Sequence, residues 1–141
     1  ALHDISVISD ATREVLTLAV TALCNEDLAV AKEVEPLEQV VDALKEQLRN
    51  RHILRLQKGE CTIELGFVWS DLLTSLERVA DHCSNIAVYQ IQVPKDEYDT
   101  HEYLQNVKHQ EHAEFDREEM AYEKRYRLPD VAKAQTAEAG E

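Results

Sequence analysis

The sequence has few of the residues that break helices and few that form covalent cross-links. Among 141 residues there are 3 glycines and 3 prolines, whereas β-sandwiches and barrels need many turns that contain these residues. The cysteines, Cys24, Cys61 and Cys83, are far apart and form no CxxC pair, so the pattern indicates a reducing compartment rather than a disulfide framework. This composition favours an all-α fold.

The chain also lacks an excess of basic residues and a long apolar run. Its formal net charge is -13, so it has no basic face with which to bind nucleic acid. No apolar stretch approaches the roughly 18–20 residues that a membrane span needs, and there is no signal peptide. These features are typical of a cytoplasmic domain. Because the sequence begins with Ala and its one Met is Met120, we expect either a processed chain or a piece excised from a longer protein.

Hydrophobic periodicity predicts two helices in the first part of the chain. The first covers about Asp4 to Cys24, and Asn25 is expected to cap the second. Pro36 is expected to bend the second helix rather than break it, and Gly59 to end it. The core positions of this helix form a heptad pattern: Val30, Val34, Leu37, Val41, Leu44 and Leu48.

Two more helices are predicted in the second part. A third begins at the capping residue Thr62 and ends before Pro94, with Trp69 and Phe67 packed against neighbouring helices. Its predicted core side consists of Leu65, Val68, Leu72, Leu76, Val79, Cys83 and Ile86. A fourth, more charged helix is predicted from a cap at 99–102 to about residue 127. Residues 1–128 should therefore form an antiparallel up-and-down helical bundle, and 129–141 a disordered polar tail.

Three of the predicted helices each carry two acidic residues that are four positions apart. The pairs are Asp10 and Glu14, Glu38 and Asp42, and Glu77 and Asp81. Counting from the predicted turns places all three pairs at one level of the bundle, to within about 3 Å of helical rise. Two carboxylates one turn apart repel by roughly 0.2–0.5 kcal/mol, so a bound cation, basic side chains or open water must offset the repulsion.

Several interpretations of these acids remain open from the residues alone. Arg13, Arg78 and Lys45 can neutralise them in ordinary ion pairs. If the pairs meet, an all-oxygen site suits Mg²⁺, Mn²⁺, Ca²⁺ or Fe³⁺, and His82, His109 or His112 would shift the preference towards iron or zinc. No histidine follows a glutamate by three positions, which argues against a ferritin-like di-iron layout. Nucleotide-binding and hydrolase motifs are absent, so no enzyme is indicated.

Several motifs in order resemble the phosphate-uptake regulator (PhoU) family. Residues 77–87, ERVADHCSNIA, resemble its third helix, and residues 34–42, VEPLEQVVD, resemble the partner motif on the preceding helix. Shorter likenesses follow at Arg51-His52, Gly59-Glu60-Cys61, Glu64-Leu65-Gly66 and Asp99-Thr100-His101-Glu102. Together they cover about residues 5–128 and are most similar to the cytoplasmic C-terminal PhoU-like domain of bacterial sodium/phosphate cotransporters.

The resemblance implies a helical bundle whose E/DxxxD motifs bind metal clusters, usually of iron or zinc. By position in the motif it implies four metal ligands: Glu38, Asp42, Glu77 and Asp81. Asp10 and Glu14 are added as ligands from the level counting alone. The resemblance also implies a regulatory, non-enzymatic role in phosphate transport or signalling, at the inner face of the cell membrane.

The implied partner is a membrane phosphate transporter, which can be the rest of the same polypeptide. A full PhoU protein has two such bundles, whereas this chain has one, so a homodimer is one way to supply the second. The alternative from a different class is a structural or protein-interaction bundle that binds no metal and whose acids face water.

Overall fold

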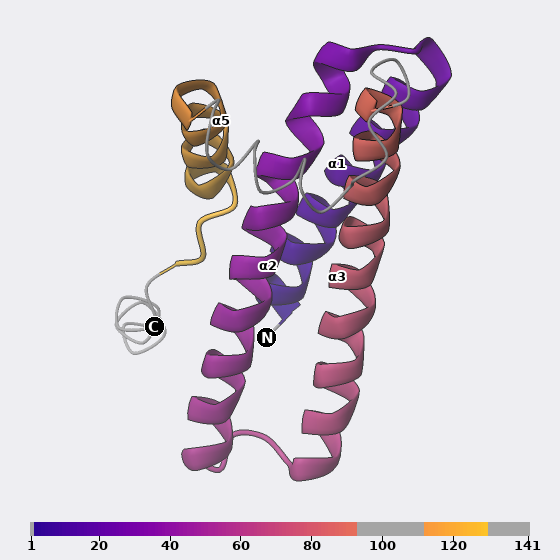
Figure 1. The fold of residues 1–141 in the computed structure, drawn as a ribbon. Helices are drawn as coiled ribbons and strands as arrows, with labels where there is room; N and C mark the ends of the chain where they lie inside the picture. The colour runs from indigo at the N-terminus through magenta and orange to yellow at the C-terminus, as the bar shows by residue number, and fades with distance from the viewer. Residues whose placement is uncertain (1, 93–111, 130–141) are drawn as a thin grey trace.

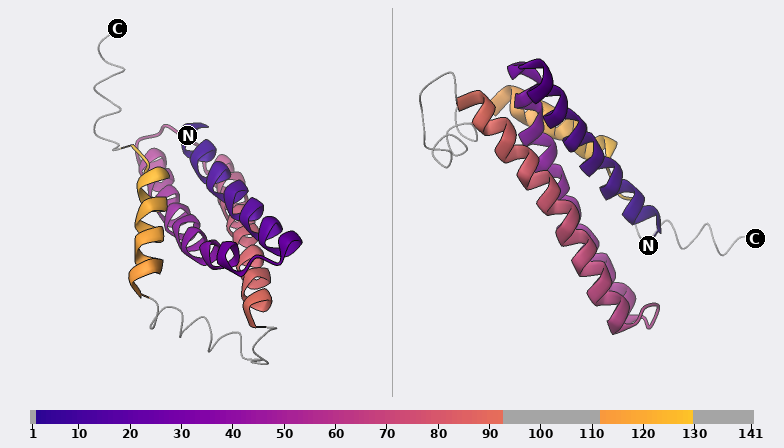
Figure 2. Two further views of the ribbon diagram at one scale, coloured as in Figure 1. Left: turned by 90° about the horizontal axis from the view of Figure 1, so that it is seen from above. Right: turned by 90° about the vertical axis from the view of Figure 1, so that its right-hand side faces the viewer.

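The fold is an all-α bundle, as the composition and periodicity predict. The computed structural model describes residues 2–92 and 112–129, and these parts contain helices and no strand. The helices are α1 (Leu2–Asn25), α2 (Leu28–Gln57), α3 (Ile63–Gln92) and α5 (His112–Arg125). Helices α1, α2 and α3 run up, down and up as a three-helix bundle, and α5 lies beside α2 (Figures 1 and 2). The predicted helix start at 99–102 and the predicted tail after 129 fall outside the described residues.

The connection between α1 and α2 corrects one predicted cap. Asn25 is the last residue of α1, and Glu26 adopts a left-handed backbone with φ 53°. The amide of Asp27 then donates to the carbonyl of Ala22 at 3.0 Å, which is the closing bond of a Schellman turn. Because this turn needs one residue after the helix, the cap of α2 falls on Asp27, whose carboxylate accepts from the amides of Ala29 and Val30.

The connection between α2 and α3 follows the sequence prediction. Gly59 has φ 73° directly after the C-cap of α2, a conformation that glycine adopts without strain. Thr62 caps α3, because its hydroxyl accepts from the amide of Leu65 at 3.3 Å. Helix α2 continues through the buried Pro36 without a break. The short turn makes α2 and α3 antiparallel neighbours.

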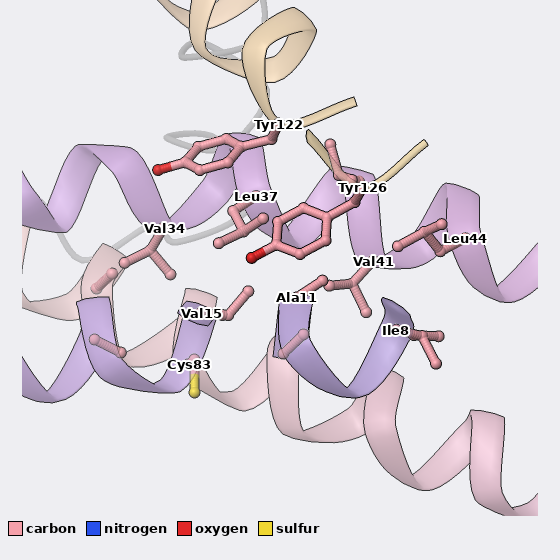
Figure 3. Packing of buried hydrophobic residues seen from close by; sticks show 14 of the residues in the cluster. Ile8, Ala11, Val15, Val34, Leu37, Val41, Leu44, Cys83, Tyr122 and Tyr126 are labelled. Atoms are coloured by element: carbon pink, nitrogen blue, oxygen red, sulfur yellow. The ribbon is translucent and has the colours of Figure 1, made fainter. Parts of the chain in front are cut away.

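The core lies between α1, α2 and α3, and α5 covers one side of it (Figure 3). The predicted heptad of α2 is confirmed, since Val34, Leu37, Val41, Leu44 and Leu48 are all buried and Val30 packs partly against them. From α1, small and β-branched residues face this heptad. The rings of Tyr122 and Tyr126 close the core from the α5 side, above Leu37 and Val41 (Figure 3).

The predicted core side of α3 was largely wrong. Of that set only Cys83 is buried, Leu76 is half-buried, and the others are exposed. The buried face instead consists of Trp69, Leu73, Ala80, Cys83, Ser84, Ala87, Val88 and Ile91, with Gln92 at its end. Small residues at Ala80, Ser84 and Ala87 let the backbone of α3 approach its two neighbours closely, and this rotates the larger apolar residues outward. Trp69 packs as predicted, but Phe67 is 70% exposed.

The hairpin of α2 and α3 extends beyond the N-terminal end of α1 (Figure 2). Here His52 is 7% exposed, and its ring stacks on Trp69 with the ring centroids 5.8 Å apart. Arg55 lies over the same indole, 4.7 Å from its centroid, and also pairs with the buried Asp4. On α3, a Cβ atom at Gly66 would lie 2.8 Å from His52 Nε2. The absence of a side chain at Gly66 therefore makes room for the imidazole.

Candidate metal centre

Carboxylates of α2 and α3 gather on one side of the bundle, and we call Glu35, Asp42, Glu77 and Asp81 the acidic cluster. Asp42 belongs to α2, and the residue as a whole is exposed to solvent although its carboxyl group is partly desolvated. Burial of its carboxyl group is the largest cause that raises its pKa, and the negative charges of Glu77, Asp81 and Glu35 raise the pKa further. The charges of Glu77 and Asp81 on α3 therefore act on Asp42 on α2.

A lysine lies within this cluster. Lys45 Nζ is 3.2 Å from Glu77 Oε2, and both side chains are 22% exposed. The positive charge of Lys45 also lowers the pKa of Asp42, although it does not outweigh burial and the acidic neighbours. Because Lys45 follows Asp42 by three positions, both side chains lie on the same face of α2.

Glu38 is the buried member of the α2 motif, and its contacts extend along α2. Its side chain is 8% exposed and accepts from Gln39 Nε2 at 2.8 Å. The same amide nitrogen donates to Glu35 at 3.1 Å, while the hydroxyl of Ser84 on α3 donates a short hydrogen bond to Glu35. Glu35 thus connects α2 with α3.

Glu35 was not among the site residues predicted from the sequence. It precedes Glu38 by three positions and Asp42 by seven, and this spacing places all three on one helix face. That spacing was a signal in the sequence that would have identified Glu35.

The acid pair of α1 lies elsewhere. Asp10 pairs with Arg13 of its own helix at 3.0 Å and accepts from the hydroxyl of Ser6. Glu14 forms an ion pair with Arg125 and accepts a short hydrogen bond from the hydroxyl of Tyr126, both at the α5 end of the chain. The level predicted for this pair leaves open the direction in which the side chains point, and the structure turns Glu14 towards α5.

The tyrosines of α5 and its C-terminal end form a second polar contact with acids of the bundle. Tyr122 donates to Glu33 at 3.4 Å, and Arg125 lies over its ring at 5.5 Å. Burial, followed by the charges of Glu33 and Glu14, raises the pKa of Tyr122 to about 12. Burial and the bond to Glu14 raise the pKa of Tyr126 to about 12 as well. Both phenols therefore remain protonated donors at neutral pH and fasten this segment to α1 and α2.

The residues predicted as metal ligands do not converge on one point in the described parts of the chain. Within residues 2–92 and 112–129, no three Asp, Glu, His or Cys side chains form a group that holds a metal as they stand. His82 is exposed to solvent. His109 and the side chain of His112 fall outside the described residues. The acidic cluster is instead occupied by an ion pair, in which the Lys45 ammonium group contacts Glu77.

The comparison with protein families decides what kind of bundle this is. The sequence profile of the PhoU domain matches residues 5–89, more than half of the chain. The chain belongs to the PhoU family. The PhoU match contains α2 and nearly all of α1 and α3, so the whole acidic cluster lies within it. Helix α5 lies outside the PhoU match.

This PhoU chain is 27% identical over 85 residues to "Phosphate-specific transport system accessory protein PhoU homolog 1" of Thermotoga maritima. The aligned part is 60% of this chain and 37% of the relative, so the PhoU chain spans well under half of that protein. No solved structure matches the chain significantly. None of the described helices has the combination of length and apolar character that crossing a bilayer requires.

Proposed function

We propose that this chain is a regulatory domain that binds metal ions and acts with a membrane phosphate transporter. Membership of the PhoU family supports the regulatory role in phosphate transport, and the named relative is an accessory protein of a phosphate-specific transport system. The motif resemblance favours a sodium/phosphate cotransporter as partner, with the domain in the cytoplasm at the inner membrane face. The role is regulatory rather than enzymatic.

The acidic cluster carries the metal part of the proposal. Its donors are carboxylate oxygens from two helices, which suit Mg²⁺, Mn²⁺, Ca²⁺ or Fe³⁺. The resemblance to the PhoU family favours iron or zinc among the possible ions. The ammonium group of Lys45 lies 3.2 Å from Glu77, at a position where the acidic side chains favour a positive charge. Asp42, Glu77 and Asp81, with Glu38 one turn from Asp42, are the residues that would hold the ion. When bound, a metal supplies positive charge that offsets the repulsion among these acids.

The proposed effect of binding follows from the placement of the donors. Asp42 is on α2, and Glu77 and Asp81 are on α3, so shared ligation would join the two helices and stabilise the bundle. Asp10 and Glu14 remain proposed ligands from the level counting, and Glu14 would first have to release Arg125 and Tyr126.

Elemental analysis of the protein, purified without a metal-affinity tag, tests metal binding directly. The proposal predicts stoichiometric metal and a lower melting temperature after treatment with a chelator. The double substitution Glu77→Gln with Asp81→Asn should remove the metal and lower the stability. Absence of metal, an unchanged melting temperature in chelator and a gain of stability in the double variant would instead favour a structural bundle that binds no metal. The ion pair between Lys45 and Glu77 is the observation that supports this second candidate.

The regulatory role is tested separately in cells. Deletion of this domain should change phosphate uptake, or its response to external phosphate, in the parent organism. The double variant at Glu77 and Asp81 should reproduce the effect if metal binding is needed for regulation. Uptake and response that match the unmodified strain after deletion would remove the regulatory proposal.

A further inference from the structure

Lys45 is placed to act as an internal cation of the acidic cluster. Its ammonium group contacts Glu77 from the neighbouring helix, and both side chains are largely shielded from solvent. Exposed ion pairs elsewhere on the bundle, such as Arg49 with Glu46, join neighbours on a single helix. The pair of Lys45 with Glu77 instead joins α2 to α3, at the level where a metal is proposed.

The Lys45 ammonium and a metal ion would compete for the same oxygen. An ion ligated by Asp42 and Glu77 needs the Glu77 carboxylate, which Lys45 now engages. A divalent ion bound beside an undisplaced Lys45 would also be repelled, by an energy that lowers affinity at least about tenfold even with the screening of water, so binding requires the ammonium group to leave. The two arrangements therefore exclude one another.

We infer that Lys45 is a built-in competitor of the metal, which sets the concentration at which the cluster becomes loaded. In the metal-free state Lys45 neutralises Glu77 and holds α2 to α3. In the loaded state Lys45 is displaced into solvent, so that metal binding replaces one bridge between the helices with another. This inference rests on the metal binding proposed above and adds the residue that regulates it.

Calorimetric titration of the complete chain, stripped with a chelator, with Zn²⁺ and separately with Mn²⁺ tests the inference. Lys45→Met keeps the aliphatic stem and removes the charge, and it should bind at least about tenfold more tightly than the wild type. Without metal this variant should melt at a lower temperature than the wild type. Lys124→Met is a matched control from α5, away from the cluster, and Lys45→Arg retains the charge; neither should bind more tightly.

A second measurement uses the wild-type protein alone and does not depend on how the variant folds. Lys45 should be acetylated faster by an amine-reactive ester when metal is present, because displacement exposes its ammonium group, while Lys124 should react at an unchanged rate. Mass spectrometry of peptides reports both residues in one sample.

The outcomes separate this inference from the proposal beneath it. Equal affinities of the wild type and Lys45→Met, or an unchanged acetylation rate of Lys45 on metal binding, would overturn the competitor role while leaving metal binding intact. If neither protein binds either metal, both the competitor role and the proposed metal function fail. Tight binding by Lys45→Met with weak or undetectable binding by the wild type supports both.

Discussion

Replacing Gly66 with alanine should weaken the bundle, although alanine is the better helix former. In the interior of a helix the change from Gly to Ala ordinarily stabilises by about 1 kcal/mol. At this position the new Cβ would lie 2.8 Å from His52 Nε2, which is well inside ordinary van der Waals contact. His52 is 7% exposed and stacked on Trp69, so its ring has little space into which to retreat.

The clash with His52 and the gain in helix propensity oppose one another, and their sizes determine whether the free energy of unfolding rises or falls. Overpacking a well-packed site costs about 1–3 kcal/mol, or about 2 kcal/mol in the middle of this range, whereas the gain in helix propensity is at most about 1 kcal/mol. We therefore expect Gly66→Ala to lower the free energy of unfolding by about 1 kcal/mol. When His52→Ala removes the ring, the clash disappears and Gly66→Ala should stabilise by about 1 kcal/mol. The coupling between the two sites is then about 2 kcal/mol.

Urea unfolding followed by circular dichroism measures all four proteins of this double-mutant cycle. Gly59→Ala is the matched control, because no atom lies within 4 Å of its added Cβ and its φ of +73° is the source of any strain. Gly59→Ala should destabilise equally with and without the His52 ring. If Gly66→Ala stabilises the protein by the same amount in both backgrounds, the close approach of His52 is not what requires glycine there.

Three other contacts give further predictions. Burial, followed by the charge of Arg55, lowers the pKa of His52 below its ordinary 6.5, so the unfolded chain takes up the proton first and stability should decline as pH falls below about 6.5. Urea midpoints at about pH 7.5 and about pH 5.5 measure this decline, and His52→Gln should reduce it. An equal decline in the His52→Gln variant would contradict the role of His52. Tyr126→Phe removes the donor to Glu14 and should weaken the attachment of α5 by about 0.5–1.5 kcal/mol; unchanged hydrogen exchange in α5 would refute this. Asp27→Ala removes the cap of α2 and should cost about 1 kcal/mol in thermal unfolding, whereas Asp27→Asn should keep most of it; equal losses would contradict the cap.

Features that depend on local chemistry could be predicted from the sequence. The turn at Gly59 and the cap at Thr62 follow from conformational preferences of single residues. The heptad of α2 was predictable because that helix is central and its apolar residues form a single stripe. The action of the Glu77 charge on Asp42 followed from the short turn between two helices of equal length.

Features that depend on rotation about a helix axis could not be predicted in the same way. Helix α3 has apolar residues around much of its circumference, so periodicity did not distinguish the face of Val79 and Ile86 from the face of Ala80 and Ala87, which is the buried one. The level of Glu14 along the bundle axis could be predicted by counting residues from the turns. The direction of its side chain depends on Arg125 and Tyr126, more than 100 residues later in the chain. Such contacts are decided by tertiary packing and leave no periodic signal.

The attachment of α5 through Glu14 has a consequence for the order of folding. Helices α1, α2 and α3 are joined by short turns, so their contacts form between sequence neighbours and close quickly. The contact between Glu14 and Arg125 spans 111 positions, so the entropy lost in closing this loop is larger than for the contacts among α1, α2 and α3. The contact offsets that loss only when α1 and α2 are already in place. We therefore expect α5 to dock last during folding and to detach first during unfolding, as a cooperative unit of its own.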